Sequence, residues 1–208
     1  MPPSVWGYND DIRDYRHDPA AARRLLKEAG LPNGFKLTLW ALPVARPYMP
    51  QGQRTAEAIQ ADLKRVGIDV TITTFEWGTY LDKLSKGDHQ AALIGWNGDN
   101  GDPDNFLYTI LDADNARPGS ASNYSFYRDP AVHKLLVAAR RVAAQPARTK
   151  LYREAQARIH ADAPLVPLFH STQLVVFRKE VEGFVVSPMS DLLFEDVRLA
   201  DPADGQTP

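Results

Sequence analysis

Residues 95–107, GWNGDNGDPDNFL, are the stretch around which the chain is organised. The run follows a short apolar segment, concentrates glycine and aspartate in a turn, and continues as an apolar segment that begins at Pro103. Such a turn can present carboxylates and backbone groups to a small cationic ligand.

Strand and helix patterns alternate upstream of this turn. The order strand, helix, strand, helix, strand is typical of an α/β layer with crossover connections. We therefore predict an α/β fold, with a mixed sheet and flanking helices. The predicted strands are 35–40, 68–75 and 90–96, and the predicted helices are 18–30, 54–66 and 76–86, with glycine after the last two.

The order loosens downstream of the turn. Residues 110–130 are a polar loop, and two proline-initiated helices follow at about 130–142 and 146–161. Their apolar stripes predict a helical hairpin packed on the sheet. The later strand candidates are 164–169, 174–177 and 183–186, and we expect the last ten residues to be frayed.

Composition excludes several classes of protein. The chain has 208 residues, of which 44% are hydrophobic and 24% charged, so it is long enough to bury one sizeable core. Its net charge of -2 and its lack of a basic run argue against a nucleic-acid surface. There is no cysteine, and we expect no export signal and no membrane anchor in the sequence as written.

Catalytic and metal motifs are weak. The histidines are isolated, without HExxH, GxSxG or a glycine-rich phosphate loop, so we expect no enzyme and no cofactor. A calcium loop built on Asp99, Asp102 and Asp104 fails because Pro103 breaks the register and Ile110 stands where a closing glutamate is needed. We expect no metal; Asp102 is instead interpreted as a helix N-cap and Asp104 as a first-turn anion.

Asp99 and Arg46 form a different pair. Asp99 follows Trp96 at the end of one predicted strand, and Arg46 follows the end of another. Ligands of open α/β sheets bind beyond the carboxyl ends of strands, so neighbouring strands would bring both charges to one cleft. A guanidinium there can take a carboxylate bidentately, although a solvated surface arginine fits the spacing as well.

Six runs carry a family resemblance. WGYNDD, DPAAARRLLKEAGLPNGF, LWALPVARPYMP, AEAIQADLKRVGIDV, GWNGDNGDPDNFL and SNYS, in this order, closely resemble the dipeptide-binding members of the extracytoplasmic solute-binding family for peptides and nickel, which serve bacterial ABC importers. The resemblance covers roughly residues 2–199.

The resemblance implies a function. Two lobes of such a protein close on the ligand, and an ABC permease is the partner in a periplasmic uptake system. It implies that Asp99 pairs with the α-ammonium of a dipeptide or a similar small zwitterion and Arg46 with its α-carboxylate. Trp96, Tyr48 and Gly95 would line the same pocket.

Length is the main departure from the family, whose members are longer by one lobe. The resemblance assigns residues 1–173 to a C-terminal ligand-binding lobe, incomplete at its N-terminus, and 174–208 to a hinge crossing and tail that packs on the other lobe. We therefore expect a fragment with weak intrinsic affinity. The alternative is a stand-alone interaction module whose apolar edge drives homodimer formation or pairing with a separate N-terminal lobe.

Overall fold

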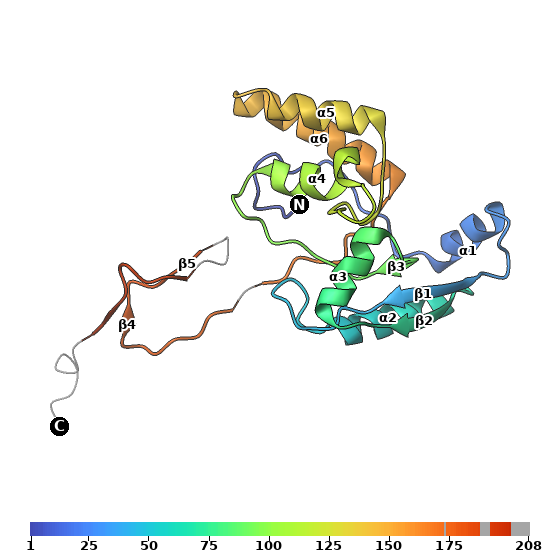
Figure 1. The fold of residues 1–208 in the computed structure, drawn as a ribbon, viewed down its shortest axis with the longest axis horizontal. Helices are drawn as coiled ribbons and strands as arrows, with labels where there is room; N and C mark the ends of the chain where they lie inside the picture. Colours follow the sequence, from blue (N-terminus) through green and yellow to red (C-terminus); the bar gives the residue numbers. More distant parts are fainter. Residues whose placement is uncertain (173, 188–191, 201–208) are drawn as a thin grey trace.

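The computed structural model describes residues 1–172, 174–187 and 192–200. Its first half is a three-stranded parallel sheet in the order β2-β1-β3, with helices between the strands (Figure 1). The predicted α/β class is confirmed. The elements are α1 (Pro19–Glu28), β1 (Lys36–Trp40), α2 (Gly52–Lys64), β2 (Asp69–Thr73), α3 (Trp77–Lys86) and β3 (Ala91–Ala92).

Local capping chemistry sets the helix boundaries. The Asp18 side chain accepts a hydrogen bond from the Ala21 N–H at 2.8 Å, and Pro19 occupies the first turn of α1. Gly87 ends α3 in the left-handed conformation, with φ of 80°. The helices before the turn therefore begin and end close to their predicted positions.

The sheet has its own hydrophobic core. Tyr80 and Leu84 of α3 are fully buried against Trp40 and Leu93, in one cluster with Ala56 of α2. The Tyr80 hydroxyl lies 2.7 Å from the Leu93 carbonyl oxygen and 3.2 Å from that of Trp40. This hydroxyl ties α3 to the ends of β1 and β3, from which the candidate site begins.

The third strand is shorter than predicted. Only Ala91–Ala92 pairs with β1, whereas the sequence pattern predicted residues 90–96. One further bond joins the Leu93 N–H to the Trp40 carbonyl, and β1 ends at Trp40. Because β1 offers no backbone partner beyond that residue, the chain leaves the sheet before Gly95.

The helices of the second half form a separate core. The prediction that the hairpin packs on the sheet is wrong, since α5 and α6 pack on each other and on α4 (Figure 1). The apolar side chains of α4 provide the packing surface, while α2 and α3 already contribute to the sheet's own core. The elements are α4 (Pro103–Leu111), η1 (Ala113–Asn115), α5 (Pro130–Arg140) and α6 (Gln145–Asp162).

The last part of the chain is an extended arm, residues 174–187 and 192–200, that reaches away from both cores (Figure 1). Strands were predicted at 164–169 and 174–177, but neither segment contains one, because the described residues supply no partner for their backbones. The predicted strand at 183–186 is confirmed in part as β5. The arm pairs β4 (Val181–Glu182) with β7 (Arg198–Leu199) and β5 (Val185–Val186) with β6 (Leu192–Leu193), both antiparallel.

Apolar side chains of the arm face solvent. Leu174 is 88% exposed and Val176 95% exposed. Most of the predicted frayed tail, residues 201–208, lies outside the described residues. Within the described ranges, no helix is both long and apolar enough to cross a membrane.

Candidate functional site

The site begins where β1 and β3 end side by side. The sequence predicts that Arg46 and Asp99 face one cleft if their strands are neighbours, and β1 and β3 are neighbours in the sheet. After β1 the chain makes a tight turn in which Arg46 and Met49 exchange backbone hydrogen bonds of 3.2 and 2.9 Å. This turn carries Arg46 and Tyr48 beyond the end of the sheet.

Arg46 is a half-buried arginine stacked on an aromatic ring. Its guanidinium carbon lies 4.0 Å from the centre of the Trp77 ring, and its Nε is buried without a hydrogen-bond partner. Among residues 1–172, 174–187 and 192–200, no carboxylate forms a salt bridge with it. Arg46 is therefore not a freely solvated surface arginine, which was the alternative that the sequence left open.

Tyr48 packs directly against Gly95. A Cβ atom at Gly95 would lie 2.3 Å from Cδ2 of Tyr48, so any side chain there would force the ring to move. Burial raises the pKa of the Tyr48 hydroxyl above its ordinary value, although the nearby Arg46 acts in the opposite direction. The contact joins the loop after β1 to the turn after β3.

Asp99 is exposed, and one amide side chain orients it. Asn105 Nδ2 donates to Asp99 Oδ2 at 3.1 Å, and Asn105 Oδ1 accepts from the Asp99 N–H at 3.1 Å. The same oxygen accepts from Trp96 Nε1 at 2.8 Å. Sequence reasoning missed Asn105; its place in the first turn of α4, where a side chain can reach back to the preceding segment, is the signal that could have found it.

The other two aspartates of the turn are structural, as interpreted from the sequence. Asp102 caps α4 by accepting from the Asp104 N–H at 2.9 Å, and both of its oxygens also lie 2.8 Å from the Arg148 guanidinium. Asp104 lies 3.4 Å from Arg140, and burial raises the pKa of its carboxyl. The turn is thereby fixed to the helical core.

The structure brings the five predicted site residues together in two groups. Arg46 and Tyr48 belong to one turn, and Tyr48 touches Gly95. Trp96, the next residue in the chain, shares the Asn105 oxygen with Asp99.

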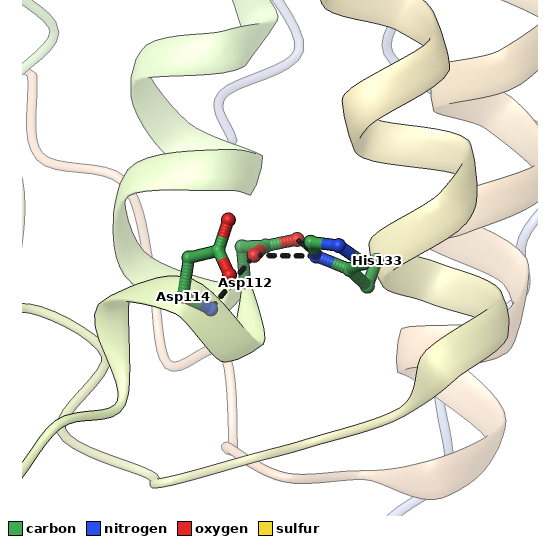
Figure 2. Close-up of side chains that lie close together, drawn as sticks. All are labelled: Asp112, Asp114 and His133. Carbon is green, nitrogen blue, oxygen red and sulfur yellow. Dashed lines mark hydrogen bonds and ion pairs between the residues drawn. The ribbon is translucent and has the colours of Figure 1, made fainter.

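A second cluster, of Asp112, Asp114 and His133, lies at the end of α4 (Figure 2). Ligand atoms of the three residues lie within 4.8 Å of one another, the spacing of a possible metal site. The fully buried Asp112 already binds His133 Nδ1 at 3.0 and 3.1 Å and accepts from the Asp114 N–H at 2.9 Å. Asp114 accepts from the Tyr108 hydroxyl at 2.8 Å. These bonds account for the cluster as a cap of η1 and a link to α5.

In open α/β sheets, ligands bind beyond the carboxyl ends of the strands, and the loops that carry Arg46 and Asp99 follow the ends of the adjacent strands β1 and β3. Residues 1–118 match the family model described as bacterial extracellular solute-binding proteins, family 5 middle. The chain belongs to that family.

Relatives and solved structures agree with this assignment. The dipeptide-binding protein of Escherichia coli K12 is 46% identical over 199 residues, which are 96% of this chain and 37% of the relative. Heme-binding protein A of Haemophilus influenzae is 40% identical over 188 residues, 90% of this chain and 34% of the relative. The chain therefore spans a little over a third of the length of the relatives it matches.

A solved structure provides the same comparison in three dimensions. The ABC transporter-associated periplasmic binding protein DppA from Helicobacter pylori, in complex with the peptide STSA, has a TM-score of 0.81 and 39% identity. The match covers 96% of this chain and 38% of that one. These homologues are solute-binding proteins and not enzymes.

Proposed function

We propose that this chain forms one wall of the dipeptide site of an ABC-importer solute-binding protein in the periplasm. The observation that carries the proposal is the pair Arg46 and Asp99, opposite charges without salt-bridge partners in the described part of the chain, beyond the ends of adjacent strands. A small zwitterion supplies the complementary charge to each.

Arg46 is arranged to receive a carboxylate. One face of its guanidinium is covered by Trp77, which fixes the plane of the group and leaves its edge as the place for an acceptor. Planar, bidentate pairing with a carboxylate is the geometry for which arginine is suited. The orphaned Nε supports the same function, because a buried donor without a partner is costly until an acceptor arrives.

Asp99 is arranged to receive an ammonium group. Its Oδ2 is held by Asn105, while no protein donor to its Oδ1 is found among the described residues. An exposed carboxylate with one oxygen fixed and one available can accept a charge-assisted hydrogen bond. Two extended residues of ~3.3 to 3.6 Å each span about 7 Å, so the separation of the two charges would select ligand length.

The arm supports a role for a second body of protein. Its exposed Leu174 and Val176 lie in an extended segment that reaches away from both cores (Figure 1), which fits the expectation that residues 174–208 pack on the other lobe. Residues 188–191 and 201–208 of that range lie outside the described part. The same exposure favours the second candidate, an interaction module that forms homodimers through the arm.

The test is a titration of the chain with alanyl-alanine, followed by nuclear magnetic resonance up to millimolar ligand because a single wall buries little of the peptide. We expect Asp99→Asn to weaken binding at least about tenfold, the equivalent of about 1.4 kcal/mol. The control is Asp88→Asn, which alters an exposed aspartate paired with Lys83 at 3.2 Å. Equal affinities of the Asp99 variant and the wild type would refute the proposal.

A further inference from the structure

Asn105 joins three groups of the turn at residues 95–102 through one side chain. We call this segment the ligand turn. Its Oδ1 accepts from Trp96 Nε1 at 2.8 Å and from the Asp99 backbone N–H at 3.1 Å. Its Nδ2 donates to Asp99 Oδ2 at 3.1 Å.

We propose that Asn105 is a positioning residue for ligand recognition: its amide sets the rotamer of Asp99 and the plane of Trp96 together, before ligand arrives. The inference rests on the proposed function, since it assigns to Asn105 the orientation of the carboxylate that would bind the ammonium.

The orientation of the amide follows from its neighbours. An indole N–H and a backbone N–H are donors only, so the Asn105 atom that faces both must be the oxygen. The NH₂ group then points to the remaining neighbour, the Asp99 carboxylate, which is an acceptor. All three bonds are satisfied by one amide orientation, and a flipped amide would lose all three.

The amide also restrains Asp99 at two points. Asn105 binds both the backbone N–H and the side-chain oxygen of Asp99, which closes a ring around the χ1 bond of the aspartate. An exposed aspartate without this ring would sample several rotamers and would have to be ordered on binding. Fixing it beforehand removes that cost from the binding free energy.

Asn105 is itself held in place by a rigid support. It lies in the first turn of α4, which Asp102 caps and which Arg148 ties to α6 through two bonds of 2.8 Å. At Gly98 a Cβ atom would lie 2.8 Å from the Phe106 ring, so the turn lies directly on α4. The amide therefore transmits the position of the helix to the ligand-facing residues.

The experiment compares two ligands, alanyl-alanine and its N-acetyl derivative, which lacks the ammonium charge. We expect the wild type to prefer the free amine, and Asn105→Ala to reduce that preference about fivefold to tenfold, the effect of about one hydrogen bond, with unchanged affinity for the acetylated ligand. A residue that merely supported the fold would weaken both ligands alike.

The matched control is Asn100→Ala. Asn100 follows Asp99 in the same turn, and its Oδ1 accepts from the Asp102 N–H at 3.0 Å rather than bonding to the Asp99 carboxylate. We expect this variant to keep the wild-type preference. Circular dichroism and the thermal midpoint of both variants check that the fold is retained.

A ligand-free measurement separates this inference from the proposed function. The indole N–H resonance of Trp96, assigned with Trp96→Phe, should move in Asn105→Ala and stay in Asn100→Ala. An unmoved resonance, or an unchanged amine preference in Asn105→Ala, overturns the positioning role. If the wild type binds neither ligand, the proposed function fails, while the Trp96 resonance still decides whether Asn105 organises the turn.

Discussion

Replacing Arg148 by methionine should destabilise the chain by about 2–3 kcal/mol, somewhat less than the ~3–5 kcal/mol that removal of one partner from a fully buried ion pair costs. The guanidinium makes two 2.8 Å bonds to Asp102, one of 2.8 Å to the Tyr152 hydroxyl and one of 3.1 Å to the Ala139 carbonyl. Methionine keeps much of the apolar stem but none of these bonds.

Partial exposure sets the magnitude. The Arg148 side chain is 19% exposed and that of Asp102 27%, so water reaches the carboxylate that would lose its partner and lowers the cost. Asp102 would also keep its bond to the Asp104 N–H. We therefore expect less than the 3–5 kcal/mol typical of fully buried pairs.

Urea unfolding followed by circular dichroism measures the change. The control is Arg24→Met, whose partner Glu28 is 3.6 Å away and whose side chains are 67% and 61% exposed, so we expect a loss below about 0.5 kcal/mol. Asp102→Asn in the Arg148→Met background should restore part of the stability, because asparagine still caps the helix and leaves no unpaired charge. A loss below about 1 kcal/mol for Arg148→Met would refute this reasoning.

Two further predictions concern other contacts. The hydrogen bond to Asp112 raises the pKa of His133, so its stabilising contribution is complete below about pH 6.5 and is lost as the pH rises through the folded-state pKa. Between about pH 5.5 and pH 8.5 the urea midpoint of the wild type should fall more than that of His133→Gln, and parallel curves would contradict this. Gly95→Ala forces the Tyr48 ring to move and should cost about 1–3 kcal/mol in the same assay, whereas an unchanged midpoint would show that the ring yields freely.

Much of the α/β layer could be predicted because its signals are local. The Asp18 cap, the Gly87 terminator and the alternation of residues 35–40 act within a few residues of the elements they specify, and each corresponds to an element of the structure. The parallel order β2-β1-β3 then places the loops after β1 and β3 together.

The errors arise from non-local partners. Residues 164–169 and 174–177 have the composition of strands, but a strand also needs a second backbone beside it, and the described chain provides none there. The hairpin of α5 and α6 was assigned to the sheet because an apolar stripe does not specify which surface it covers.

The candidate site shows the same division. Arg46 and Asp99 could be chosen from their positions after predicted strands and from the family resemblance. Asn105 was missed, although its place in the first turn of α4 is a local signal. Trp77 could not be chosen, because its role depends on a contact with Arg46 that exists only in the folded chain.

The ligand turn, residues 95–102, is held from the sides of both cores. Tyr48 contacts it from the sheet side at Gly95, and Arg148 holds it from α6 through Asp102. Under the proposed function, a substitution in α6 would thus shift Asp99, the group proposed to face the ammonium, without altering any of the proposed ligand-binding residues. Natural selection on solute preference consequently has two sets of positions to act on, and those in the helical core are the ones that a comparison of pocket-lining residues alone would overlook.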